Sequence, residues 1–124
     1  ENFYFFKNLS RNLFLSLYKN SSFQIGNSSS GIIESASIPI PVINVGDRQK
    51  GRSQSGNVIF CKTAINDICV AIKKARDKKF TDNLININNI YGNGKSAHKT
   101  MKILTKLNFE KMKYKIEDPM DISH

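Results

Sequence analysis

The sequence has no long apolar run, little cysteine and few acidic residues. No apolar run approaches the ~18 residues that a membrane-spanning helix needs, so no transmembrane segment is expected. Cys61 and Cys69 match neither a metal-ligand spacing nor a disulfide framework, so we expect two buried, reduced thiols and no metal site. Residues 1–20 lack the charged start, apolar middle and cleavage site of a signal peptide, and a cytoplasmic location is therefore expected.

Acidic residues are outnumbered, since 10 Asp and Glu stand against 19 Lys and Arg and give a formal charge of +9. An excess of cations can bind the phosphates of a nucleic acid where the cations are clustered. Most of the cations here are lysines dispersed among acids, and no basic-aromatic module is present. A basic module that binds nucleic acid or a protein partner is therefore the weaker functional hypothesis.

The remaining composition is that of a globular domain, with 124 residues of which 40% are hydrophobic and 23% charged. Short apolar runs alternate with helical periodicity, which predicts βαβ units and a mainly parallel sheet. Only about four strands are available by this pattern, so we predict part of a doubly wound, Rossmann-like α/β domain over residues 1–108. The charged, aperiodic residues 109–124 are predicted to form a frayed, flexible tail.

The strands are predicted where apolar runs are short, and the helices where apolar residues recur on one face. The predicted strands are residues 1–7, 23–25, 42–45 and 58–60. The predicted helices are residues 11–20, 30–37, 64–79 and 97–107, with an Asn-rich loop over 81–95. Ser10 and Thr63 are the expected N-caps of the first and third helices. The second helix must end before Pro39, because the residue before a proline resists the helical conformation.

The segment GNSSSG at residues 26–31 lies where a predicted strand gives way to a helix. Small residues at a helix N-terminus let a phosphate approach unpaired N–H groups, and Ser28, Ser29 and Ser30 could add hydroxyl donors. The alternative is that one serine simply caps the helix. Three serines followed by Gly31 favour a phosphate site, although the Walker motif is absent.

Spacing leaves the roles of the nearby charged residues open. Glu34 could close a capping box if Gly31 were the N-cap, or it could accept the two hydroxyls of a ribose. Arg48 and Arg52 lie in the polar loop after the next strand, and arginine suits paired contacts with phosphate oxygens. From spacing alone, a solvated basic loop is the better interpretation of these two arginines.

Four segments carry a resemblance to a known family: GNSSSGIIE at 26–34, PVINVGDRQKGR at 41–52, NVI at 57–59 and YGNGKSA at 91–97. In this order they resemble the C-terminal part of UDP-N-acetylglucosamine 2-epimerases. The NSSSG form resembles the hydrolysing branch of sialic-acid and related nonulosonic-acid pathways, because the non-hydrolysing branch typically has a TDSGG-like turn. Asn93 stands where this family commonly has Asp, which leaves the role of the YGNGK loop open.

The resemblance implies two Rossmann-like domains of the glycosyltransferase B kind, with a UDP-sugar in the cleft between them. It places Ser28 and Ser29 on the UDP phosphates, Glu34 on the ribose and Arg48 at the nucleotide. It also aligns Leu9 with a position whose backbone meets the uracil. Ser30 and Gly31 are added as phosphate support from the pattern of the turn.

The chemistry that the resemblance implies is elimination of UDP from the sugar followed by addition of water with inversion at the 2-acetamido carbon. The family's acid and base carboxylates belong to an N-terminal domain that is missing here, so no catalytic residue is assigned and the isolated chain is expected to be inactive. His98 is interpreted as a surface histidine. No cofactor is expected, and the full-length enzyme could be a homo-oligomer. The alternative enzyme is a nucleotide-sugar glycosyltransferase of the same architecture.

Overall fold

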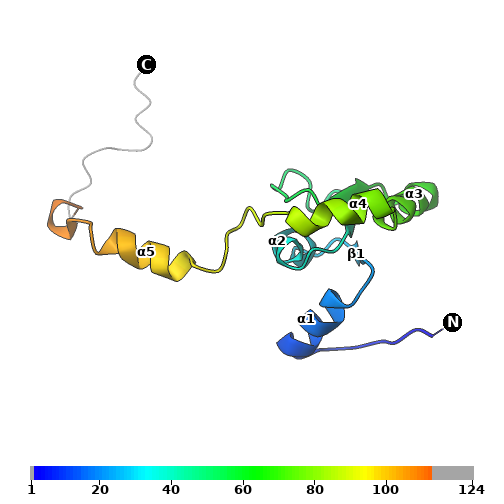
Figure 1. Ribbon diagram of the computed structural model, residues 1–124, viewed down its shortest axis with the longest axis horizontal. Coiled ribbons are helices and arrows are strands. Elements are labelled where there is room, and N and C mark those ends of the chain that lie inside the picture. The colour runs from blue at the N-terminus through cyan, green and yellow to red at the C-terminus, as the bar shows by residue number, and fades with distance from the viewer. Residues whose placement is uncertain (1, 113–124) are drawn as a thin grey trace, which may run out of the picture. The chain divides into compact units, whose positions relative to one another are not determined.

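The computed structural model describes residues 2–112, which form two compact units divided after Tyr91 (Figure 1). The first unit contains a three-stranded parallel sheet in the order β1-β2-β3. Its strands are β1 (Gln24–Gly26), β2 (Val42–Val45) and β3 (Val58–Cys61). Ile43 of the central strand is paired with Ile25 on one side and Ile59 on the other. The predicted α/β class with a parallel sheet is confirmed.

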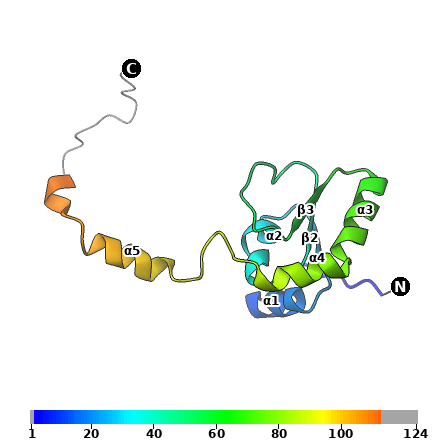
Figure 2. The same cartoon turned by 45° about the horizontal axis from the view of Figure 1, so that its top comes forward.

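Helices precede, separate and follow these strands. They are α1 (Arg11–Lys19), α2 (Ser30–Ile33) with the 3-10 turn η1 (Ser35–Ser37), α3 (Ile65–Ala75), and α4 (Lys78–Asn83) with the 3-10 turn η2 (Leu84–Asn86). Figure 2 shows α2 and α3 on opposite sides of the strands. The sheet is therefore covered on both faces, as expected for part of a doubly wound, Rossmann-like domain.

Two apolar clusters form the core, one on each face of the sheet. The cluster under α3 consists of Ile43, Ile59, Ala71 and Ala75. The cluster under α2 consists of Ile32, Val42 and Val58. Adjacent strand residues alternate between the clusters because successive side chains point to opposite faces of a strand. This double burial explains why the strands are short, nearly continuous apolar runs.

Residues 2–7 are not a buried strand, contrary to the prediction. They have no regular secondary structure, and Phe3, Tyr4, Phe5 and Phe6 are all exposed, Phe5 by 93%. Within residues 2–112 the sheet contains only β1, β2 and β3, so this segment pairs with neither of the two edge strands. A strand is stabilised by its neighbours rather than by apolar composition alone, which is why the sheet has three strands instead of four.

The predicted helices agree with the structure best where a local cap forms. Ser10 caps α1, its Oγ accepting a hydrogen bond from the Leu13 N–H at 3.4 Å. Thr63 does not cap α3, because Ala64 occupies the N-cap position and makes no side-chain bond. The long helix predicted over residues 64–79 is divided, since Asp77 Oδ1 accepts from the Phe80 N–H at 3.0 Å and starts α4. Part of the predicted Asn-rich loop is consequently helical.

The two cysteines are free thiols, as predicted, but neither is fully buried, contrary to the prediction. Cys61 is half-buried at the end of β3, and burial raises the pKa of its thiol, with a smaller contribution from Asp67. Cys69 is exposed. The buried stripe of α3 runs through Ala71 and Ala75, which turns Cys69 toward solvent.

The second unit contains α5 (Ser96–Leu104) and the 3-10 turn η3 (Phe109–Met112). The helix matches the predicted element at its start and ends before the predicted Leu107. His98 on this helix is exposed. Of the predicted flexible tail, residues 113–124 lie outside the described residues. Among residues 2–112, no helix is long and apolar enough to cross a bilayer.

Candidate functional site

Two polar segments follow neighbouring strands at the carboxyl edge of the sheet. We name residues 27–31 the serine turn, which joins β1 to α2, and residues 46–57 the β2–β3 loop. In an open parallel sheet, ligands bind outside this edge because the loops that lead into helices gather there. The structure therefore places the predicted phosphate-binding segment at the edge where such sites occur.

Within the serine turn, the hydroxyls bond to one another and to the backbone. Ser28 Oγ accepts hydrogen bonds from the Ser30 N–H at 3.3 Å and from Ser30 Oγ at 3.0 Å. Ser29 is the N-cap of α2 by position, but its side chain makes no capping bond. Ser28 is exposed, while Ser29 and Ser30 are half-buried. The bonded hydroxyls are thus those of Ser28 and Ser30.

Gly31 is buried and lies where α2 approaches the sheet most tightly. A Cβ at this position would lie 2.8 Å from Val42 Cγ1 and 3.0 Å from Gln24 Oε1. Carbon atoms without a bond between them do not approach this closely, so a side chain here would push α2 away from β2. The glycine has a clear packing role in addition to any support for a ligand.

Arg48 lies beside the serine turn although the two are separated in sequence. Its Nη1 is 3.5 Å from both the backbone oxygen and the Oδ1 of Asn27. Gln49 Nε2 donates to the same backbone oxygen at 2.9 Å. Gln49 is only 2% exposed and fixes the β2–β3 loop against the turn, which leaves the guanidinium of Arg48 exposed at its rim. Sequence reasoning missed Gln49, because a glutamine in a polar loop carries no motif.

Glu34 follows α2 and forms an ion pair with α1. Its Oε1 accepts from Arg11 Nη1 at 2.8 Å, and its Oε2 is buried without a hydrogen-bond partner. The capping box considered for this residue does not form, since the N-cap of α2 is Ser29 rather than Gly31. Arg11 was missed by sequence reasoning, because the pair joins residues 23 positions apart.

Leu9 and Glu34 line two separate hollows, both of which border α1. Half-buried Leu9 belongs to an apolar hollow of about 250 Å³ that also includes Tyr18 and Gln24. Glu34 and Arg11 belong to another of about 300 Å³. The structure thus brings Arg48 to Asn27 at the start of the serine turn, whereas Leu9 and Glu34 line hollows that border the first helix.

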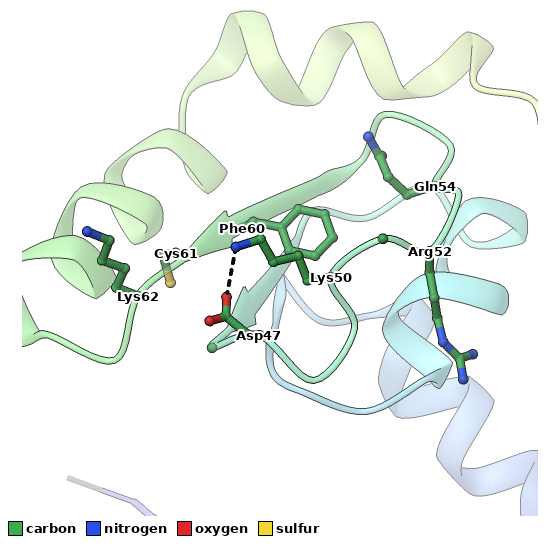
Figure 3. Close-up of a pocket in the computed structure, with 9 residues that line it drawn as sticks. Asp47, Lys50, Arg52, Gln54, Phe60, Cys61 and Lys62 are labelled. Carbon is green, nitrogen blue, oxygen red and sulfur yellow. Dashed lines mark ion pairs between the residues drawn. The ribbon is translucent and has the colours of Figure 1, made fainter.

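A larger hollow of about 510 Å³ lies beyond the ends of β2 and β3 (Figure 3). Its charged and aromatic lining residues are Asp47, Lys50, Arg52, Phe60 and Lys62. Lys50 Nζ and Asp47 Oδ1 are 3.8 Å apart, and both side chains are exposed. Three of the lining residues are basic and one is acidic. The sequence alone favoured a solvated basic loop for Arg52, and Figure 3 shows its guanidinium pointing away from Asp47 and Lys50.

The last residues of the first unit tie the β2–β3 loop to η1. Asn89 Nδ2 donates to Ser37 Oγ at 2.7 Å, and Tyr91 Oη donates to the Ser53 oxygen at 2.7 Å. The tyrosine of the YGNGK segment therefore has a structural contact in this unit. Among residues 2–112, no cluster of three or more His, Cys, Asp or Glu side chains is arranged to hold a metal ion.

Comparison with known proteins places this arrangement in one family. The sequence profile described as UDP-N-acetylglucosamine 2-epimerase matches residues 1–105. The chain is 47% identical over 78 residues to the GDP/UDP-N,N'-diacetylbacillosamine 2-epimerase (hydrolyzing) of Campylobacter jejuni, covering 63% of this chain and 20% of that protein. It is 39% identical over 98 residues to the UDP-N,N'-diacetylbacillosamine 2-epimerase (hydrolyzing) of Legionella pneumophila, covering 79% and 25%.

A third relative is the polysialic acid biosynthesis protein P7 of Escherichia coli, which is 45% identical over 67 residues, 54% of this chain and 17% of that protein. The chain thus spans between a sixth and a quarter of the length of these relatives. The profile match covers most of the chain, and the parallel sheet with helices on both faces agrees with it. The chain therefore belongs to the UDP-N-acetylglucosamine 2-epimerase family, which has the glycosyltransferase B type of fold.

Proposed function

We propose that this chain supplies the UDP-binding surface of a hydrolysing 2-epimerase. The substrate is UDP-N-acetylglucosamine or a UDP-diacetamido hexose, and the products are UDP and a 2-epimerised amino sugar for sialic or nonulosonic acid synthesis. Two relatives are named as hydrolysing 2-epimerases of diacetylbacillosamine nucleotides, and a third as a polysialic acid biosynthesis protein. These names support the hydrolysing branch over a glycosyltransferase of the same architecture.

The observation that carries the proposal is the position of Arg48 beside the serine turn. Ser28 and Ser29 offer hydroxyls, Ser30 and Gly31 shape the turn, and the guanidinium supplies positive charge at the same edge. Hydroxyl donors and arginine together suit the oxygens of a diphosphate. In the proposed elimination, UDP leaves as an anion, and these groups would stabilise the negative charge that develops on it.

Glu34 and Leu9 are proposed to hold the nucleoside part. A carboxylate accepts hydrogen bonds from ribose hydroxyls, and Oε2 of Glu34 has no hydrogen-bond partner within the described residues. Arg11 holds Oε1 and so limits how the carboxylate rotates. The backbone at Leu9 is proposed to meet the uracil.

The elimination step also needs a general base, and we assign none in this chain. The family's acid and base carboxylates are proposed to come from an N-terminal domain, which is then the partner that completes the site. The isolated chain is expected to bind UDP without turning over a UDP-sugar. Release of UDP from UDP-N-acetylglucosamine by the purified chain tests this, and sustained turnover would show that a catalytic group is present.

Calorimetric titration of the chain with UDP tests the binding proposal. Arg48→Ala is expected to weaken binding about tenfold, since hydrogen bonds to charged groups contribute roughly 1.5–3 kcal/mol. Arg76→Ala is the matched control, because Arg76 is an exposed arginine at the end of α3, which lies on the opposite side of the strands from α2 (Figure 2). Equal losses in both variants would indicate a general effect of charge and contradict the site.

Glu34→Gln separates the ribose contact from the phosphate contact. The amide keeps the shape of the carboxylate but loses its charge, so binding of both UDP and uridine is expected to weaken about fivefold. Arg48→Ala is expected to weaken UDP binding far more than uridine binding. If Glu34→Gln left both ligands unaffected, the assignment of Glu34 to the ribose would be wrong.

A further inference from the structure

Four side chains form a continuous hydrogen-bond path from α1 to the exposed serine turn. Tyr18 Oη donates to Gln24 Oε1, and Gln24 Nε2 donates to Ser30 Oγ at 3.3 Å. Ser30 Oγ then donates to Ser28 Oγ at 3.0 Å. We name this the tyrosine–serine path, and it connects α1, β1 and α2.

The path has a fixed direction because its first member is always a donor. Tyr18 is only 5% exposed, and burial raises the pKa of its phenol to about 12. The phenol is therefore protonated at neutral pH, and its proton is directed at the carbonyl oxygen of Gln24. The amide group of Gln24 must then present its N–H donors on the other side, where Ser30 lies.

The direction of the path determines what Ser28 can offer to a ligand. A serine hydroxyl has one proton and two acceptor lone pairs. The oxygen of Ser28 accepts from both Ser30 Oγ and the Ser30 N–H, which occupies both lone pairs. The proton of Ser28 is left over, and this residue is exposed. Ser28 is thereby prepared to donate, and it is poorly suited to accept from a ligand or to bind a cation.

We propose that Tyr18 and Gln24 are positioning residues that, through Ser30, orient the hydroxyl of Ser28 toward a ligand that only accepts hydrogen bonds. This inference rests on the proposed UDP-binding function and specifies its ligand chemistry: the turn receives the unprotonated oxygens of a diphosphate. The guanidinium of Arg48 beside Asn27 supplies the matching positive charge. Neither Tyr18 nor Gln24 contacts the ligand itself.

A purely structural role for Gln24 would affect every ligand of the chain equally, whereas a positioning role affects the phosphates. The test is an NMR titration of the full chain with UDP and, separately, with uridine, which lacks the diphosphate. Gln24→Met keeps the volume of the side chain but removes both of its hydrogen bonds. This variant is expected to lower the affinity for UDP about fivefold to tenfold. Its affinity for uridine is expected to stay within about twofold of that of the unmodified chain.

Gln24→Glu tests the direction of the path at nearly constant shape. A carboxylate accepts from Tyr18 and from Ser30, so the hydroxyl of Ser30 turns away from Ser28. We expect UDP binding to fall at least as far as with Gln24→Met, again without loss of uridine binding. Tyr18→Phe releases the amide of Gln24 and is expected to weaken UDP about threefold, with no further loss when combined with Gln24→Met.

Tyr91→Phe is the matched control, because it removes a tyrosine hydroxyl that donates to Ser53 rather than to the path. It is expected to leave UDP binding unchanged. Should Gln24→Met fail to fold, the other two path variants decide the question. Normal UDP binding by the folded path variants would overturn the positioning role alone, as would equal losses for UDP and uridine. A chain with no affinity for UDP would overturn the proposed function as well.

Discussion

Two neighbouring polar clusters around α2 are held together by different interactions, one by hydrogen bonds between neutral side chains and the other by an ion pair. The neutral cluster consists of two hydrogen-bonded groups, Tyr18 with Gln24 and Ser30, and Ser35 with Asn57, whose bonds are partly buried in the first and buried in the second. The charged cluster consists of Arg11 and Glu34, and the side chain of Arg11 is 66% exposed. Buried hydrogen bonds are costly to lose, whereas exposed ion pairs contribute little. The neutral cluster should therefore contribute more to the stability of the fold than the charged cluster.

The largest effect is expected where α2, which carries Ser30 of the neutral cluster, packs against the sheet. Gly31→Ala would place a methyl group 2.8 Å from Val42 Cγ1, so the free energy of unfolding should fall by about 2–3 kcal/mol. Denaturant unfolding of the chain measures this change. Adding Val42→Ala removes the clashing methyl group, and the double variant should lose less than the sum of the single losses. If the loss in the double variant equalled the sum of the two single losses, α2 would be moving away from β2 without strain.

The second effect is the pH dependence of the neutral cluster. The pKa of Tyr18 is about 12 in the folded chain, raised mainly by burial, against 10.0 in the unfolded chain. The folded state therefore binds more protons between pH 10 and 12, so stability is full below pH 10 and is lost as the pH rises through 12. The loss attributable to Tyr18 is of the order of 2 kcal/mol.

Unfolding measured at pH 9 and at pH 11.5, with and without Tyr18→Phe, isolates this contribution from the other groups that titrate there. The phenylalanine variant should be less stable at pH 9 and lose less on going to pH 11.5. If both proteins lost the same free energy of unfolding between pH 9 and pH 11.5, the phenol would not be held protonated by the fold.

A third, smaller effect should follow from Ser35→Ala. Ser35 is fully buried, and its Oγ donates to the Gly31 oxygen at 2.6 Å and accepts from Asn57 Nδ2 at 2.7 Å. Removing the hydroxyl leaves a buried amide donor with one partner fewer, which should cost about 1–2 kcal/mol irrespective of salt. Thermal unfolding measures it, with exposed Ser22→Ala as the control. Equal stability of the two variants would remove Ser35 from the neutral cluster.

The smallest effect should come from the charged cluster. Arg11→Ala is expected to lower stability by about 0.5 kcal/mol or less, because an exposed ion pair gains little in water. The difference from the unmodified chain should shrink further in 1 M salt, which screens exposed charges. A loss as large as that of Ser35→Ala would show that Glu34 depends on Arg11 for folding and would end the contrast between the two clusters.

Local signals in the sequence predicted most of the secondary structure. The cap at Ser10 and the apolar stripe after it predicted α1, and three of the four apolar runs are strands of the sheet. The fourth run, residues 2–7, was wrongly predicted because a strand also needs a neighbour, which composition does not reveal. The helix boundary at Asp77 was missed because a run of lysines and alanines around it continued the helical pattern.

For the candidate site, the sequence predicted the kind of residue but not its partners. The serines, Glu34 and Arg48 were identified from spacing and family resemblance, and their roles in binding UDP stay predictions. Their contacts with Asn27 and Arg11 join residues 21 and 23 positions apart. Such contacts depend on strand register and on how α2 packs against β2, and no local sequence pattern encodes either.

The sequence by itself determined the parallel α/β architecture, the family and the position of the serine turn after the first strand, because these follow from local periodicity and from short motifs. Tertiary structure alone decided that Arg48 lies beside that turn and that hydrogen bonds connect Tyr18 and Gln24 to Ser30. The physical reason is that a hydrogen bond requires its two atoms to meet at the right distance and angle. For residues far apart in the chain, only the packed fold can provide that geometry.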